Sequence, residues 1–280
     1  MKYTPEDVLK FSKDVALPGG TLVMGFSGWM DGGDVSTGTV QRLVELLAAH
    51  EIAQIDGEPF YLYNFPGPME LSALFRPHIN IDEGLIDKID MSTGTFYCHP
   101  DGNLALFLGK EPNLHWRLYA DAIFAFARTV GVRRILFVGS FGGNVPHTRQ
   151  SRLYVTGSNS DVLQEMLAYR VQPTNYEGPG SFTSYLLSRA QDAGLEMASL
   201  VAEIPGYLQG ANPVSIEAVT RRLAKILKLP LDLDSLRGAS TQWELQVSSA
   251  VEQDEDFAEK VRELERDYDN ELIENDPGES

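Results

Sequence analysis

A histidine and an arginine follow a glycine-rich turn near the middle of this chain, and together they could carry out acid–base chemistry on an anionic ligand. The turn reads Gly139-Ser-Phe-Gly-Gly143, and Pro146-His-Thr-Arg149 comes two residues later. His147 can exchange a proton near neutral pH, and the Arg149 guanidinium can hold a carboxylate or a phosphate. Ser140 lies outside a Gly-x-Ser-x-Gly nucleophile motif, because Val138 stands where the first glycine is needed. The alternative for His147 is a structural hydrogen bond in a rigid loop.

A second glycine-rich turn, Gly25-Phe-Ser-Gly-Trp-Met-Asp-Gly-Gly33, follows an apolar run near the N-terminus. It lacks the Lys-Ser/Thr ending of a P-loop and the Gly-x-Gly-x-x-Gly spacing of a dinucleotide site. A cradle for a polar ligand at a helix N-terminus is one interpretation, although Asp31 and Asp34 would repel an anion. The other is a strand-to-helix turn whose glycines permit close packing. The sequence leaves both open.

Three glutamates stand close to glycines at other expected element ends, and they widen the choice of acid–base groups. Glu111 lies in Gly109-Lys-Glu-Pro-Asn113, Glu177 in Tyr176-Glu-Gly-Pro-Gly180, and Glu203 shortly before Tyr207. No His-x-x-x-His or clustered carboxylate spacing accompanies them, and the single Cys98 rules out a cysteine zinc cluster. We therefore expect neither a metal nor a cofactor.

These turns are positioned by alternating strands and helices, which predict an α/β fold with a mostly parallel sheet and helices on both faces. Residues 66–91 show no clear period and are expected to be loop with short pieces. Helices are expected to begin at the cap residues Asp34, Asn113, Ser158, Ser181 and Asn212 and to extend to about His50, Val130, Tyr169, Ala193 and Lys228. Strands are expected over 21–26, 59–65, 95–98, 104–108, 133–139, 153–156 and 195–203.

The C-terminal part is expected to be purely helical and strongly acidic. Residues 251–280 carry thirteen acids and three bases, a net charge of −10 out of −17 for the chain. Thr241-Gln-Trp-Glu244 fits a capping box. An apolar stripe runs from Trp243 to Tyr268, and its interruption at Asp254 predicts a bend or a join between two helices. We expect an α/β domain over 1–235, a helical appendage over 236–275 on the body or a neighbouring subunit, and a disordered tail over 276–280.

Charge and hydropathy narrow the classes of partner. A chain of net charge −17 repels phosphate backbones, so nucleic-acid binding is not expected. The N-terminus has no apolar segment typical of a signal peptide, and no run is long enough to span a bilayer, so we expect a cytoplasmic protein without membrane contact.

Residues 20–235 resemble the PAC2 family, named for proteasome assembly chaperone 2, in several motifs that occur in the same order. These are the two glycine turns, Gly109-Lys-Glu-Pro-Asn113 with Trp116, Val145-Pro-His-Thr-Arg149 and Tyr176-Glu-Gly-Pro-Gly180. Residues 261–269 are similar to the helical extension of its bacterial branch. The resemblance implies a three-layer α/β/α core of the phosphorylase/hydrolase-like type, a trimer, and C-terminal helices lying over a ligand pocket. It implies no established reaction, although eukaryotic relatives act in proteasome assembly. The chain departs from the family pattern at Pro205-Gly-Tyr207, where Pro-His-Tyr is expected.

The leading hypothesis is a non-catalytic protein that binds a ligand or a partner in an assembly or chaperone-like role, with a pocket at the carboxyl ends of the strands. The alternative is a hydrolase or phosphorylase acting on a nucleoside-like or peptide-like substrate, with His147, Glu111 and Glu203 as catalytic candidates. A third possibility is a scaffold whose contact surface is the acidic helical stripe. The expected ligand-binding residues are Gly25, Gly28, Trp29, Asp31, Gly32, Gly109, Glu111, Gly139, Ser140, Gly142, Gly143, His147, Arg149, Glu177 and Tyr207.

Overall fold

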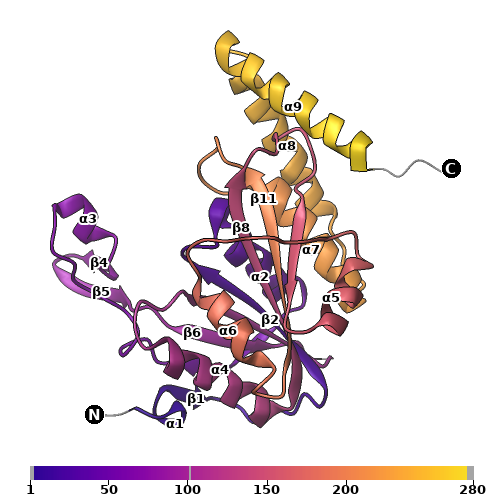
Figure 1. The fold of residues 1–280 in the computed structure, drawn as a ribbon. Helices are drawn as coiled ribbons and strands as arrows, with labels where there is room; N and C mark the ends of the chain where they lie inside the picture. The colour runs from indigo at the N-terminus through magenta and orange to yellow at the C-terminus, as the bar shows by residue number, and fades with distance from the viewer. Residues whose placement is uncertain (1–2, 101, 276–280) are drawn as a thin grey trace.

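The fold is a nine-stranded sheet covered by helices on both faces, as the computed structural model of the chain shows for residues 3–100 and 102–275 (Figure 1). The four central strands β7, β2, β8 and β11 are parallel, and antiparallel strands flank them on both sides. The α/β class expected from the sequence is therefore confirmed. In spatial order the strands are β1 (Leu9–Phe11), β3 (His50–Ile55), β6 (Gly94–Cys98), β7 (Leu104–Lys110), β2 (Gly20–Ser27), β8 (Val132–Gly143), β11 (Glu196–Pro205), β9 (Leu153–Gly157) and β10 (Gln172–Pro173).

The sheet divides the hydrophobic core into two clusters, one on each face. Successive side chains of a strand point to opposite faces. Thus Leu22, Met24 and Phe26 of β2 join one cluster, whereas Val23 joins the other. Helices α4 and α6 contribute to the first cluster, and α2, α5 and α7 to the second. The helices are α1 (Pro5–Val8), α2 (Val35–Leu46), α3 (Met69–Ala73), α4 (Trp116–Val130), α5 (Ser160–Leu167), α6 (Phe182–Ala190), α7 (Pro213–Leu227), α8 (Asp234–Val251) and α9 (Glu255–Asn275).

The strand expected over 59–65 is wrong. This segment begins with a turn in which the Phe60 amide donates to the Gly57 carbonyl. The strand that pairs with β6 in the sheet is β3, which lies earlier in the chain. The Phe60 ring is fully buried and meets the Tyr119 ring edge-on, with centroids 4.7 Å apart. An irregular segment that is buried in the tertiary structure needs apolar residues just as a buried strand does, so the two give the same apolar run in the sequence.

Two expected helix caps are displaced by one or two residues, and a third is in place but makes no side-chain capping bond. Asp34 is the N-cap residue of α2, as expected, but it adopts φ 54° and its side chain makes no capping hydrogen bond. Asp31 instead accepts from both the amide and the hydroxyl of Thr37. The side chain of Asn113 instead accepts from the Leu62 amide, and α4 begins after His115. Helix α5 is capped by Asn159, the neighbour of the expected Ser158. By contrast, the expected caps Ser181 and Asn212 are confirmed.

Residues 65–91 form a projecting arm that contains α3, β4 (His78–Asp82) and β5 (Leu85–Asp90) (Figure 1). The sequence predicted loop with short pieces here, and the structure adds a two-stranded antiparallel hairpin that does not join the main sheet. Its cross-strand pairs include Ile79 with Ile89 and Ile81 with Ile86. The hairpin therefore carries apolar pairs outside the main core.

Helices α8 and α9 extend beyond one end of the sheet, above β8 and β11 (Figure 1). The capping box expected at Thr241 is wrong, because α8 already begins at Asp234 and the Thr241 hydroxyl donates to the Arg237 carbonyl inside the helix. The break expected at Asp254 is confirmed: its carboxylate accepts from the Phe257 amide at the start of α9. The tail expected over 276–280 lies outside the described residues. Among the helices of the described part of the chain, none has the length and apolar composition needed to cross a membrane.

Candidate functional site

The carboxyl ends of β2, β7, β8 and β11 lie at one edge of the sheet because these strands are parallel. Open α/β sheets bind ligands at such an edge. Nearly all of the residues expected to bind a ligand lie in the C-terminal halves of these strands or shortly after them, and the structure divides them into separate contact groups. Glu177 is the exception, as it lies exposed in the loop before α6.

Glu111 ties the end of β7 to the turn after β2 and to the start of α6. Its carboxylate accepts hydrogen bonds from the Trp29 amide at 3.0 Å and from the Phe182 amide at 2.7 Å. Phe182 is the first residue of α6, so the carboxylate also lies at the favourable positive end of a helix dipole. Gly28 has φ 135°, and a Cβ there would lie 3.0 Å from the Glu111 Cβ. Glycine thus allows the carboxylate to approach this backbone.

Asp31 and Ser140 hold the first turn against the second. Besides capping the start of α2 through Thr37, Asp31 forms an isolated backbone β-bridge with Ser140. In this bridge the Ser140 amide donates to the Met30 carbonyl at 2.9 Å. The Ser140 hydroxyl donates to the Gly32 carbonyl at 2.7 Å and is fully buried. Burial, opposed by the Thr37 hydrogen bonds, raises the pKa of Asp31 to about 6. The serine hydroxyl is therefore occupied in joining two turns.

Several of the expected ligand glycines lie where helices or aromatic rings pack closely. A Cβ at Gly25 would come within 2.6 Å of the Ser36 carbonyl oxygen of α2. Cβ atoms at Gly109 and Gly139 would come within 2.8 Å and 2.7 Å of the Phe107 and Phe137 rings. These positions require glycine for packing. At Gly25 this favours the second of the two interpretations that the sequence left open for the first turn.

Glu203 is buried at the end of β11 and holds the chain that follows β8. Its carboxylate accepts from the Asn144 amide at 2.8 Å and from Arg152 and Tyr154 at 3.3 Å each. The side chain is 7% exposed, and Arg152 supplies the compensating charge that a buried carboxylate needs. Gly143 packs against the Glu203 carboxylate, and a Cβ at this position would collide with it.

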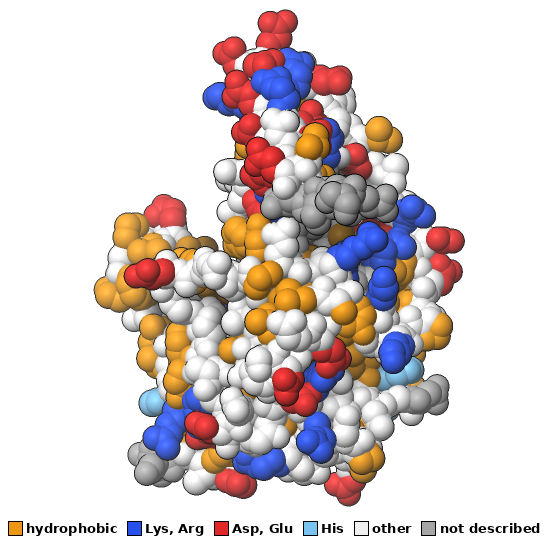
Figure 2. Space-filling model, turned by 45° about the vertical axis from the view of Figure 1, so that its right-hand side comes forward, with side chains coloured by type: hydrophobic (Ala, Val, Ile, Leu, Met, Phe, Trp, Pro, Cys, Tyr) orange, Lys and Arg blue, Asp and Glu red, His pale blue; other side chains and the backbone are white. Residues whose placement is uncertain are grey.

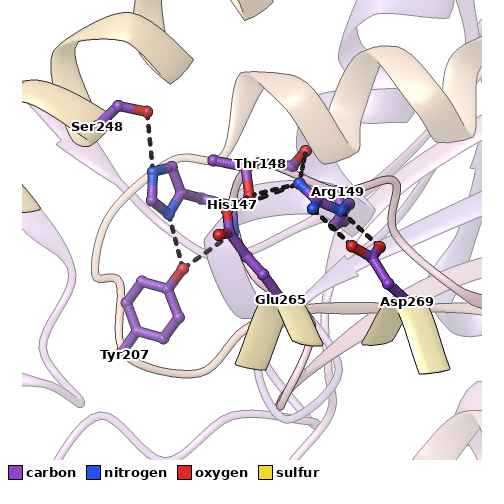
Figure 3. A network of polar contacts seen from close by, with 7 residues as sticks. All are labelled: His147, Thr148, Arg149, Tyr207, Ser248, Glu265 and Asp269. Carbon is purple, nitrogen blue, oxygen red and sulfur yellow. Dashed lines mark hydrogen bonds and ion pairs between the residues drawn. The ribbon is translucent and has the colours of Figure 1, made fainter. Parts of the chain in front are cut away.

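His147 is buried between Tyr207 and α8, and its whole residue is 3% exposed (Figure 3). Its own amide donates to the Tyr207 phenol oxygen at 2.9 Å, and Nδ1 lies 2.7 Å from that oxygen. Nε2 lies 3.1 Å from the Ser248 hydroxyl. Burial lowers the pKa of His147, although Glu265 and Glu244 oppose the shift. A neutral ring fits these contacts when the phenol donates to Nδ1 and the Nε2–H donates to Ser248.

Helix α9 contacts residues 146–152, which we name the clasp loop, through polar side chains (Figure 3). Arg149 forms a two-point ion pair with Asp269, with both Nε–Oδ1 and Nη2–Oδ2 at 2.8 Å, and lies 3.6 Å from Glu265. Thr148 also donates a short hydrogen bond to Glu265. The Tyr268 phenol donates to the Gln150 carbonyl at 2.9 Å. The guanidinium expected to hold an anionic ligand is thus occupied by a carboxylate of this chain.

The structure brings His147 together with Tyr207, both of which the sequence singled out. Glu111, Glu203 and His147 instead belong to three contact groups, each with its own backbone or side-chain partners. The sequence missed Ser248, Glu265 and Asp269, because the pattern of a helix gives no sign of which polar groups on the body it will meet. Within residues 3–100 and 102–275, no three His, Cys, Asp or Glu side chains are arranged so as to hold a metal ion.

Comparison with known proteins places this geometry in a family. The family model described as the PAC2 family matches residues 25–251. The crystal structure of a Mycobacterium tuberculosis proteasome-assembly chaperone homologue is 26% identical with a TM-score of 0.75, covering 86% of this chain and 99% of that one. A PAC2 family protein from Streptomyces avermitilis is 28% identical with a TM-score of 0.74 and the same coverage.

A protein of unknown function from Corynebacterium glutamicum has the same fold, with a TM-score of 0.83 at 21% identity. The match covers 96% of this chain and 99% of that one, so the C-terminal helices are included in a shared architecture. No protein of curated function matches this chain. Since the family model spans most of its length, the chain belongs to the PAC2 family.

Proposed function

We propose that this protein is a non-catalytic partner-binding protein with an assembly or chaperone-like role, and that it works as a homo-oligomer. The observation that carries the proposal is the arm over residues 65–91. Met69 and Leu85 are 80% and 75% exposed, although both are large apolar side chains. Exposed apolar patches of this kind are typical of protein contact surfaces. The arm also exposes Leu71, Leu74, Ile79, Ile81, Ile86, Ile89 and Met91.

The arm's hairpin needs a covering surface because two isolated strands are only marginally stable in water. Its apolar pairs, Ile79 with Ile89 and Ile81 with Ile86, are exposed, and the arm projects away from the body (Figure 1). We assign the covering surface to a second copy of this chain, since each copy carries an arm and cyclic contacts can then cover all of them. The trimer that the family resemblance implies is one such closed ring.

The relatives support a partner-binding role. The Mycobacterium tuberculosis protein, 26% identical, is described as a proteasome-assembly chaperone homologue. Contacts within the site favour the same conclusion: Glu111, Glu203, His147 and Arg149 each stabilise the chain's own loops and helices. The hydrolase alternative gains no support, because no acid–base pair among them meets at one point. A ligand pocket at the carboxyl ends of the strands remains part of the proposal.

The test is the molecular mass in solution, measured by light scattering after size exclusion. The double variant Ile81→Ser/Ile86→Ser removes one apolar cross-strand pair, and Asn80→Ser/Lys88→Ser changes the neighbouring pair of the same hairpin as a matched control. We expect an oligomeric wild type and control, and a monomeric apolar-pair variant whose circular dichroism is unchanged. A monomeric wild type, or an apolar-pair variant that stays oligomeric, would overturn the arm assignment. A catalytic turnover lost in His147→Ala would overturn the non-catalytic role.

A further inference from the structure

A hollow of about 460 Å³ lies between the clasp loop, the C-terminal end of α5, helix α7 and Glu244 of α8. This volume falls in the range of about 300–1,000 Å³ that is usual for small-molecule sites. Figure 2 shows Lys and Arg side chains gathered on the body just below the C-terminal helices. We name this hollow the basic groove. Its charged lining residues are Arg149, Arg170, Arg221, Arg222, Lys225, Glu217 and Glu244.

Five cations and two carboxylates line the basic groove, in a chain whose net charge is −17. Two of the cations are neutralised, since Arg149 pairs with Asp269 and Arg221 pairs with Glu217. The other three cations of the groove form no ion pair with any carboxylate in the described part of the chain. The lining therefore carries three more cations than carboxylates, although the chain as a whole is strongly acidic.

Two of these unbalanced cations are held close together. Arg222 donates through Nη1 to the carbonyl oxygens of Tyr169 and Arg170, which fixes its guanidinium beside the end of α5. Arg170 has φ 57°, a left-handed conformation that is unfavourable for a side chain of this type. Burial and the positive charge of Arg170 both lower the pKa of Arg222. The fold therefore keeps like charges together at an energetic cost that an anion between them would relieve.

We propose that the basic groove binds a small polyanion, a molecule of metabolite size with two or more clustered phosphate or carboxylate groups. Guanidinium groups bind both kinds of oxyanion through paired hydrogen bonds, and Lys225 adds a point charge. The volume of about 460 Å³ fits a ligand of metabolite size. The proposal is independent of the arm, because none of the lining residues belongs to residues 65–91.

The experiment is isothermal titration calorimetry of the full chain at low ionic strength with pyrophosphate and, separately, citrate. The test variant is Arg170→Gln/Lys225→Gln, because both residues are exposed and neither forms an ion pair within the described part of the chain. The control is Lys13→Gln/Lys260→Gln, which removes two exposed cations outside the groove and makes the same change in net charge. Circular dichroism melting verifies that both variants are folded.

We expect the wild type and the control to bind at least one probe, and the groove variant to bind it about tenfold or more weakly. Binding of pyrophosphate alone identifies phosphate chemistry, binding of citrate alone identifies carboxylate chemistry, and binding of both identifies the shared polyanion site. Absence of binding to the wild type would overturn the proposal, as would an equal loss in the control, which would indicate a general charge effect. Binding of a poly-glutamate peptide without binding of either probe would instead identify an acidic polypeptide ligand and also overturn it.

Discussion

At the scale of single residues, Asp31 couples a helix start to pH. Its carboxylate caps α2 through Thr37, and its burial raises its pKa to about 6 from the usual 3.8. The folded protein thus binds the proton more tightly than the unfolded chain, so stability falls as pH rises through this interval and stays lower above it.

We expect Asp31→Asn to remove this dependence. Between pH 4.5 and pH 7 the wild type should lose on the order of 1 kcal/mol of unfolding free energy relative to the variant, allowing for partial exposure of the carboxyl group. Urea unfolding at several pH values measures the difference. Asp34→Asn serves as the control, because Asp34 does not cap the helix with its side chain. Parallel pH profiles for wild type and Asp31→Asn would contradict the expectation.

His147 titrates in the opposite sense. Burial lowers the pKa of His147, so on acidification the unfolded chain takes up a proton near the ordinary value of 6.5, before the folded protein does. Stability from this group is therefore present above pH 6.5 and lost on acidification.

His147→Gln should reduce the loss of stability between pH 7.5 and pH 5.5, which thermal unfolding at the two values measures. The glutamine amide is not protonated in this pH range, so it lacks the positive charge whose burial destabilises the folded protein when the imidazole is protonated. His50→Gln, at a partly exposed position on β3, is a matched control. The prediction fails if the wild type and His147→Gln lose the same amount of stability on acidification.

At the scale of elements, the α8–α9 pair is held to the body by a small apolar cluster and by the clasp loop. Val251, Ala258 and Val261 are buried together, with Val247, Phe257 and Tyr207 packed against them. The Tyr207 and Phe257 rings meet edge-on, with centroids 5.4 Å apart. Because Tyr207 also hydrogen-bonds His147, apolar packing of the helices and order in the clasp loop depend on each other.

Val261→Ser should therefore destabilise both the packing of α9 and the ordered conformation of the clasp loop. We expect faster deuterium exchange in residues 146–152 as well as in α9, because the small cluster loses one of its three buried side chains. Lys260→Ser changes the adjacent exposed position and should leave the exchange unchanged. Faster exchange confined to α9, with the clasp loop still protected, would show that the two are not coupled.

At the scale of the whole molecule, the arm and the charge make opposite contributions to self-association. The exposed arm favours contact through burial of apolar surface, whereas the net charge of −17 favours repulsion. Salt screens the repulsion and leaves the apolar contribution intact.

We therefore expect the oligomer to persist, or to become tighter, when sodium chloride is raised from about 0.1 to 1 M. Sedimentation velocity over a range of protein concentrations measures this. The Ile81→Ser/Ile86→Ser variant should stay dissociated at both salt concentrations. Dissociation of the wild type at high salt would mean that ion pairs, and not the arm, hold the copies together.

Local signals predicted much of the fold. The strands around the two glycine turns, the caps Ser181 and Asn212 and the break at Asp254 depend on neighbouring residues, and all are confirmed. The strand expected over 59–65 was wrong because burial of Phe60 by α4 imitates a strand pattern. The cap expected at Ser158 was wrong by one residue because a second capping residue, Asn159, lies next to it.

The sequence by itself determined the four central parallel strands, the glycine turns next to two of them, and the resemblance to the PAC2 family, because these properties depend on residue types at short spacing. Only the tertiary structure decided what the charged groups contact. Arg149 meets Asp269 and Thr148 meets Glu265 across 120 and 117 positions of the chain. The unbalanced cations of the basic groove likewise come together from α7 and the end of α5. Such pairings depend on how helices pack, and packing is a property of the folded chain as a whole.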